Sequence, residues 1–275
     1  MTMIPLEDSF TDILGKAQRG AQLNDADLAA QAGIPVEMLT RVKGGVVDLQ
    51  ALPRLAKTLR LGPAALVASA QKSWYPRPHA VEGLAQINTT YEDMTVNAYL
   101  VWDPATREAA VFDTGADVGP ILQAIAAKQL RVKLILLTHT HPDHIADLAR
   151  LKRETGAPVY VGALEPTEGA ETFPAGRSFS LGRLAIETRQ TSGHSVGGIT
   201  YVISGLAVPV AVVGDAIFAG SMGGGGISYS DALSNNRKHL FSLPDTTVLC
   251  PGHGPLSTVG EEKQHNPFYP EFQNT

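Results

Sequence analysis

THTHPDH, at residues 138–144, follows directly after the apolar run VKLILL at residues 132–137. A short apolar run predicts a buried strand, and the loop after a strand lies at the edge of a sheet. The loop holds three imidazoles and a carboxylate, which are ligands for zinc, iron or manganese near neutral pH. The stretch predicts a metal site open to substrate; the alternative is a solvated surface loop rich in histidine. The ligand residues are His139, His141, Asp143 and His144.

Four further polar residues follow strand-like runs and lie in loops that contain glycine. Any one of them alone is a helix cap, a turn residue or a surface histidine more often than a ligand. Together with residues 138–144, their ordered set predicts one site built from several loops. These residues are Asp113 in FDTG, His194 in SGHS, Asp215 in VGDA and His253 in GHGP.

The composition narrows the class of protein. The chain has 275 residues, 44% of them hydrophobic, which is enough for a sizeable core. A net charge of −5 argues against nucleic acid or an anionic membrane as the main partner. The single cysteine, Cys250, excludes an internal disulfide and cysteine-rich zinc modules. Residues 1–8 lack the pattern of a signal peptide, and no run of about 18 apolar residues exists, so we expect a cytoplasmic protein.

Residues 1–72 predict a small all-α domain of about five helices. Asn24 or Asp25 can cap a helix that stops at Gly33, and Pro35 opens the next helix. The stretch LAAQAGI at residues 28–34 and the later leucines make this region resemble the Cro/C1 repressor type of helix-turn-helix domain.

The charge of residues 1–72 argues against sequence-specific DNA binding. Residues 1–72 hold eight Lys or Arg and seven Asp or Glu, whereas a DNA-binding face is basic. The second helix begins PVEM at residues 35–38, with few groups that could read bases. We therefore expect packing or regulation from this domain, with DNA contact through residues 1–72 as the alternative.

Residues 73–79, SWYPRPH, predict a linker in which Trp74 and Tyr75 pack between the domains. Residues 80–275 alternate strand-like and helical runs, which predicts a layered α/β domain. We expect a hairpin from residues 96–102 and 109–112. We also expect a strand over 132–138 and one helix over 144–155 whose first turn carries ligands.

The ordered set HTHPDH at 139–144 with His194, Asp215 and His253 resembles the metallo-β-lactamase superfamily. The resemblance implies an αβ/βα sandwich with two metal ions, zinc first, with iron or manganese as alternatives. It implies that Asp215 bridges both ions and that Asp113 orients the histidine loop from outside the ligand set. One ion would be held by His139, His141 and His194, and the other by Asp143, His144 and His253.

TSGHSVGG at 191–198, GDAIF at 214–218 and PGHGP at 251–255 are similar to the glyoxalase II group of thioester hydrolases. That resemblance implies attack by a metal-bridging hydroxide, with Asp143 as ligand or proton carrier. Only 22 residues follow His253, too few for the group's glutathione-holding domain. The group's Gly-Arg pair is replaced by GSMGGGG at 220–226, either a flexible surface loop or a loop that admits substrate.

The sequence thus predicts a binuclear metal-dependent hydrolase of thioester, acyl-ester or lactone substrates, with Asp143 and Asp215 as catalytic residues. One alternative is a persulfide dioxygenase with a single iron held by His139, His194 and Asp215. Another is a transcription regulator whose sandwich domain senses a ligand. The expected partner is a small molecule; a homo-oligomer is left open.

Overall fold

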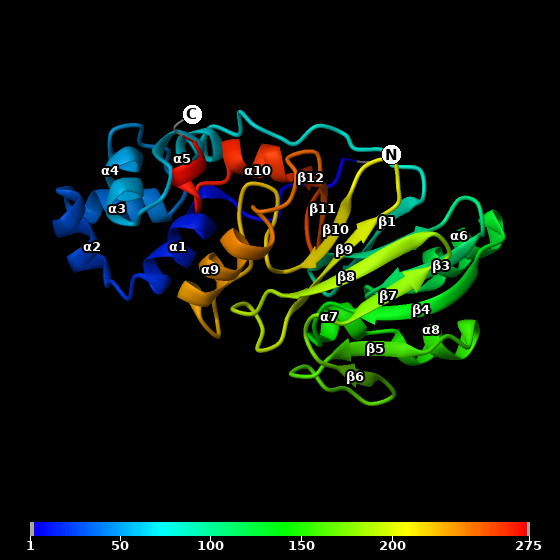
Figure 1. Ribbon diagram of the computed structural model, residues 1–275. Coiled ribbons are helices and arrows are strands. Elements are labelled where there is room, and N and C mark those ends of the chain that lie inside the picture. The colour runs from blue at the N-terminus through cyan, green and yellow to red at the C-terminus, as the bar shows by residue number, and fades with distance from the viewer. Residues whose placement is uncertain (1–2, 274–275) are drawn as a thin grey trace.

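Two six-stranded sheets face each other in the computed structural model, which describes residues 3–273 (Figure 1). In the first sheet β1 to β3 are antiparallel and β3 to β6 parallel; in the second only β10 and β11 are parallel. The first sheet comprises β1 (Leu84–Tyr91), β2 (Met94–Trp102), β3 (Glu108–Phe112), β4 (Arg131–Leu137), β5 (Val159–Gly162) and β6 (Glu171–Phe173). The second comprises β7 (Ser178–Leu181), β8 (Leu184–Gln190), β9 (Ile199–Ser204), β10 (Val210–Gly214), β11 (Val248–Pro251) and β12 (Ser257–Thr258).

Helices cover the outer faces of both sheets. On the first sheet lie α6 (Gly119–Lys128), α7 (Pro142–Ile145) and α8 (Leu148–Thr155), and on the second lie α9 (Tyr229–His239), α10 (Val259–His265) and the short η1 (Pro270–Phe272). The helix–sheet–sheet–helix order confirms the predicted αβ/βα sandwich. None of the described helices is long and apolar enough to span a membrane.

The core between the sheets is apolar and is closed by hydrogen bonds near the strand ends. Phe112 of the first sheet packs edge-on against Tyr201 of the second, with ring centroids 5.3 Å apart. The buried Tyr201 hydroxyl donates to the Leu137 carbonyl at 2.7 Å, and the Tyr99 hydroxyl donates to the Pro251 carbonyl at 2.7 Å. Both acceptors directly precede predicted ligand loops, so these bonds fix the spacing between the two halves of the site.

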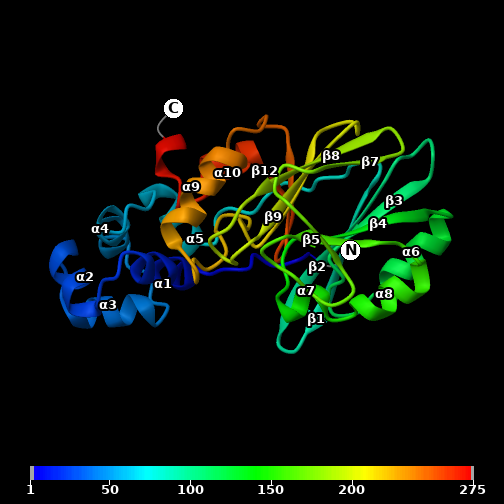
Figure 2. The same cartoon turned by 60° about the horizontal axis from the view of Figure 1, so that its bottom comes forward.

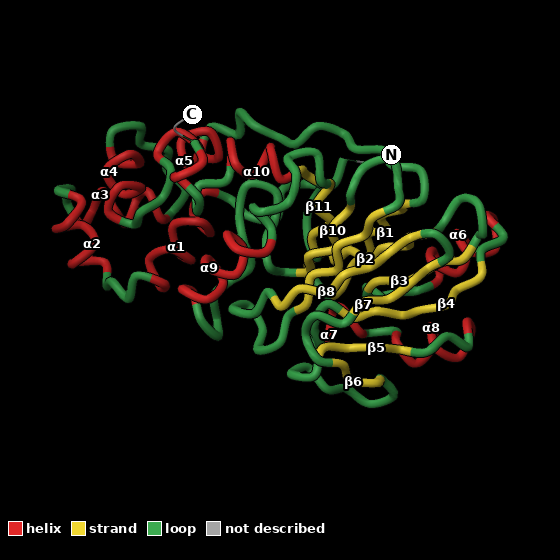
Figure 3. Tube along the Cα trace, in the orientation of Figure 1, coloured by secondary structure: helices red, strands yellow, loops and turns green. Residues whose placement is uncertain are grey.

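The helices expected in residues 1–72 are present at one end of the molecule (Figure 3). The Asn24 side chain accepts the Asp27 amide at 2.8 Å, and Gly33 ends the second helix with a φ of 65°. The helices are α1 (Phe10–Gly20), α2 (Asp25–Ala32), α3 (Val36–Lys43), α4 (Ala51–Thr58) and α5 (Pro63–Ala70).

This helical bundle shares a hydrophobic core with the sandwich. Its buried residues form one cluster with residues of β10, α9 and α10, and Figures 1 and 2 place α9 and α10 beside α1 and α5. In the predicted linker, Trp74 stacks on His265 with ring centroids 4.8 Å apart. The division into residues 1–72, 73–79 and 80–275 stays a prediction. One hydrophobic cluster contains residues from both the first and the last of these segments.

The prediction of one continuous helix over residues 144–155 is wrong, although α8 ends at the predicted Thr155. The structure breaks it into α7 and α8 at residues 146–147 because the Thr114 amide donates to the His144 carbonyl at 2.8 Å, and the Asp147 amide donates to Thr114 Oγ1. The sequence also missed β1, β6, β7, β12 and α9, which are short, polar or amphipathic segments.

The shared core leads to a prediction about unfolding. Leu66 of α5 is fully buried, so Leu66→Ala should lower the free energy of unfolding by about 2–5 kcal/mol. We expect one thermal transition at a lower midpoint, seen alike by far- and near-ultraviolet circular dichroism. Leu49→Ala is the control, because Leu49 is 53% exposed and should change stability by less than about 0.5 kcal/mol. Two separate transitions would show that the bundle unfolds on its own.

Candidate metal centre

The eight predicted site residues come from the ends of strands that the two sheets bring face to face. Asp113 follows β3, residues 139–144 follow β4, and these belong to the first sheet. His194 lies between β8 and β9, Asp215 follows β10 and His253 follows β11, all in the second sheet. The seven predicted ligands gather in three overlapping groups, and Asp113 lies directly behind them.

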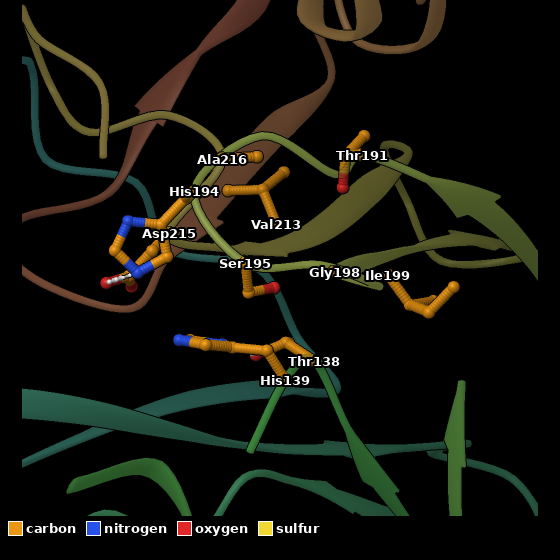
Figure 4. A pocket seen from close by; sticks show the side chains of 10 residues that line it. All are labelled: Thr138, His139, Thr191, His194, Ser195, Gly198, Ile199, Val213, Asp215 and Ala216. Carbon is orange, nitrogen blue, oxygen red and sulfur yellow. Dashed lines mark hydrogen bonds and ion pairs between the residues drawn. The ribbon is translucent and has the colours of Figure 1, made fainter. Parts of the chain in front are cut away.

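The first group contains three ring nitrogens. His141 Nδ1 lies 3.0 Å from His139 Nε2 and 3.0 Å from His194 Nε2. His139 is buried, His194 is half-buried and His141 is exposed, so the group opens to solvent on one side. Figure 4 shows His139, from the first sheet, and His194 pointing into the same space from opposite sides.

The second group consists of Asp143, His144 and His253. His253 Nε2 lies 3.3 Å and His144 Nε2 lies 3.5 Å from Asp143 Oδ2. All three side chains are buried. The structure therefore brings together the three residues that the resemblance assigned to the second ion.

Asp215 connects the two groups. Its Oδ1 lies 3.4 Å from His144 Nε2, and its Oδ2 lies 3.3 Å from His194 Nε2 and 3.4 Å from His253 Nε2. The dashed line in Figure 4 marks its pairing with His194. One carboxylate thus faces both groups, as a bridging ligand requires.

Acceptors outside the ligand groups orient four of the imidazoles. Each Nδ1–H finds an oxygen, which leaves Nε2 free to face the site. His144 Nδ1 donates to Asp113 at 2.9 Å, and His253 Nδ1 donates to the Thr95 carbonyl at 2.6 Å. His194 Nδ1 donates to the Gly224 carbonyl at 3.1 Å, and His139 Nδ1 bonds Thr138 Oγ1 at 3.0 Å.

The buried Asp113 carboxylate is the hub of these contacts. It accepts the Thr138 amide and the Thr138 hydroxyl, both at 2.7 Å, in addition to His144. Because the Thr138 hydroxyl gives its one proton to Asp113, it accepts the proton of His139 Nδ1. Asp113 itself has a φ of 56°, a strained conformation for a residue with a side chain, which these contacts hold in place.

Charge divides the imidazoles into two kinds. Burial and the neighbouring His144 hold the pKa of His139 well below its usual range, and burial also lowers the pKa of His194. Burial would lower the pKa of His144, but Asp215 and Asp113 raise it to about 10. Burial would also lower the pKa of His253, but Asp143 and Asp215 raise it to about 11. Without metal, protons therefore sit in the second group at neutral pH, and His139 and His194 stay neutral.

Divalent cations fit this arrangement. His144 Nε2 and Asp215 Oδ1 are buried without a hydrogen-bond partner among the described residues, although they face each other. In the first group, His141 Nδ1 carries at most one proton for the two ring nitrogens that face it at 3.0 Å, so a cation between the three nitrogens would satisfy them better. Nitrogen and carboxylate donors of this kind suit zinc, iron or manganese.

Two glycines allow this dense packing. A Cβ on Gly252 would lie 2.1 Å from Asp215 Oδ1, and one on Gly223 would lie 1.9 Å from the Asp215 carbonyl oxygen. Residues 220–223 are buried, so the interpretation of residues 220–226 as a flexible surface loop is wrong for that part. The run instead packs against the site.

Glu165, which was not among the predicted site residues, links two loops that carry candidate ligands. Its carboxylate accepts the Thr140 hydroxyl at 2.7 Å and the Gly197 amide at 2.9 Å. Glu165 thus links the loop of residues 138–144 to the loop that carries His194. No local pattern marks it, because its partners lie 25 and 32 residues away in the chain.

The site adjoins an open cleft and a small inner cavity. The inner cavity of about 10 Å³, about the size of one water molecule, lies beside His139, His194 and Asp215 (Figure 4). The cleft has a volume of about 940 Å³ and reaches His141 and His194. Its size suits a small-molecule ligand.

The chain belongs to the metallo-beta-lactamase superfamily, whose family model matches residues 91–253. A curated relative is hydroxyacylglutathione hydrolase GloC of Haemophilus influenzae, which is 29% identical over 62% of this chain and 92% of its own length.

Solved structures with this fold include the BLEG-1 B3 metallo-beta-lactamase, with a TM-score of 0.59 and 27% identity over 68% of this chain and 99% of that one. TTHA1623 in a di-iron-bound form has a TM-score of 0.55 and 25% identity over 66% of this chain and 99% of that one.

The position of Asp113 leads to a prediction about metal affinity. Asp113→Asn keeps the size of the side chain but removes the charge that holds Thr138 and His144. We expect metal affinity, measured by competition with a chromogenic chelator, to fall by about 10- to 100-fold. Asp117→Asn is the matched control, because Asp117 is 57% exposed and pairs with Arg150 outside the site. Equal affinities in the two variants would contradict the orienting role of Asp113.

Proposed function

We propose that this protein is a binuclear metal-dependent hydrolase of thioester or related acyl-ester and lactone substrates. The observation that carries the proposal is the Asp215 carboxylate, which faces both ligand groups at 3.3–3.4 Å. A single carboxylate shared in this way suits two ions better than one. We assign His139, His141 and His194 to one ion, Asp143, His144 and His253 to the other, and Asp215 to both.

Divalent ions at such a site lower the pKa of water and polarise a carbonyl, which is the chemistry that acyl hydrolysis needs. The protein's part is to hold the ligands and to manage protons. Burial would raise the pKa of Asp143, but His253 and His144 lower it, so Asp143 is ionised at neutral pH. We therefore assign Asp143 two roles, as a ligand and as the acceptor that passes a proton to the leaving group.

The substrate class rests on the likeness to the hydroxyacylglutathione hydrolase, together with the stretches at residues 191–198, 214–218 and 251–255. Zinc is the first choice of metal, and iron is the second because one similar structure is in a di-iron-bound form. A cytoplasmic location stays part of the proposal.

DNA binding is not part of the proposed function. The predicted reading helix, α3, begins with the exposed Val36 and Glu37, and its Lys43 pairs with Asp25 at 2.6 Å. A gel shift on genomic fragments tests the regulator alternative directly: salt-sensitive binding at micromolar protein would support it.

The first test joins metal content to a substrate panel. Protein reloaded with zinc, iron or manganese should hold two ions per chain by elemental analysis and should hydrolyse a thioester, an ester or a lactone. Asp215→Asn should lower kcat by about a thousandfold or more, because both ions lose a ligand. Asp245→Asn, at an exposed ion pair with Lys263, should leave kcat unchanged.

Other outcomes separate the alternatives. One iron per chain together with oxygen consumption on a persulfide would favour the dioxygenase. Inactivity on every thioester, ester and lactone, with two ions bound, would refute the proposed function.

The second test concerns pH. Metal and proton compete for the same ring nitrogens, and the raised pKa values of His144 and His253 mean that metal must displace protons from them below about pH 10. Acid therefore weakens metal binding, more steeply in the second group than at His139 and His194. We expect kcat/KM to fall as the pH drops below neutrality and to recover partly with added metal. A profile that stays flat down to about pH 5 would count against imidazole ligation.

A further inference from the structure

The cleft beside the metal centre has a wall that the sandwich does not supply. One side is formed by residues 224–230, which follow the buried part of the glycine-rich loop. The facing side is formed by the end of α1 and the turn after it, through Lys16, Arg19, Gly20 and Gln22. Unlike residues 224–230, these four residues lie outside the 91–253 segment matched by the family model. The bundle therefore contributes to the cleft that reaches His141 and His194.

Several contacts fix α1 in this position. Asp8, just before the helix, accepts from Lys16 and from Ser221 Oγ, the latter at 2.5 Å. Lys16 Nζ also donates to the Met222 carbonyl at 2.8 Å, within the loop that packs on Asp215. The wall is thus held by the same loop that packs against the metal ligands.

Gly20 brings the helix end against the other wall. A Cβ on Gly20 would lie 2.3 Å from the Tyr229 ring, so only glycine allows this approach. Tyr229 begins α9 and is half-buried. The two walls therefore meet in a tight contact between Gly20 and Tyr229.

The charge of the cleft is positive and concentrated on Arg19. Among the described residues that line the cleft, none is Asp or Glu. Asp8 compensates Lys16, whereas Arg19 is exposed and has no carboxylate within ion-pair distance among the residues that the structure describes. Glu7, whose carboxyl interacts with Lys16 and His253, does not line the cleft. One guanidinium is therefore available to a ligand that approaches His141.

We propose that α1 is the specificity wall of the active site and that Arg19 binds a carboxylate or similar anionic group on the substrate. A guanidinium offers paired donors that match a carboxylate, and the serine hydroxyls at 228 and 230 lie on the same cleft. This inference rests on the proposed acyl hydrolase function and narrows its substrates to anionic thioesters or esters. Arg19 is then a specificity-determining residue and has no part in the bond-breaking step.

Two matched substrate pairs test the proposal. One pair is the S-ethyl monothioester of succinate and its methyl ester; the other is S-acetyl-3-mercaptopropionate and its methyl ester. The pairs place the carboxylate on the acyl side and on the thiol side. In Arg19→Gln, we expect KM for the anionic member of at least one pair to rise about tenfold, with kcat and the neutral member little changed.

Arg41→Gln is the control, because it removes the same charge from an exposed position on α3, away from the cleft. Arg19→Glu should reverse the preference, so that the methyl ester becomes the better substrate. Equal KM changes for the anionic and neutral members of both pairs, in Arg19→Gln and Arg19→Glu alike, would overturn the proposal.

A binding experiment separates this inference from the proposed function. If the metal-loaded wild type cleaves neither pair, succinate is titrated onto the same zinc-loaded protein and followed by NMR. Weaker succinate binding by about tenfold in Arg19→Gln, but not in Arg41→Gln, would then support the anion site although thioester hydrolysis had failed. Identical binding by all three proteins would overturn it.

Discussion

The contact between the Asp113 carboxylate and the loop of residues 138–144 is the constraint on which the rest of the site depends. It fixes the backbone at Thr138, the tautomer of His139 and the ring of His144 at once. Asp113 is able to do so because it leaves β3 in a left-handed conformation beside the end of β4. A strained residue outside the ligand set thus organises residues that belong to it.

The helical bundle is also attached to the region around the candidate site, through a shared hydrophobic core and a hydrogen bond. Its core merges with the outer face of the second sheet, and the segment before α1 binds Ser221 next to the site. The helices α1 to α5 are therefore packed as part of a larger structure. This packing places some charged residues of the bundle, such as Arg19, at the cleft and others, such as Arg41, on the outer surface.

Much of the fold and the clustering of the candidate ligands could be predicted from the sequence, because these residues lie in short patterns after apolar strands. The helix ends at Asn24 and Gly33 followed from local chemistry, whereas the sandwich was expected from the resemblance to the metallo-β-lactamase superfamily. The break at residues 146–147 could not be predicted, since Thr114 causes it from 33 residues away. Glu165 and Arg19 were missed for the same reason: their importance comes from neighbours that only the tertiary structure brings close.

The two tyrosine hydrogen bonds between the sheets make the hydrophobic core a spacer for the metal site. His139 to His144 belong to one sheet, while His194, Asp215 and His253 belong to the other, so the thickness of the core sets the distance between the two halves. Substitutions deep in the sandwich that alter its volume would therefore tune metal affinity without touching a ligand. The thickness of the core between the sheets therefore affects both the packing of the sandwich and the distances between the candidate metal ligands.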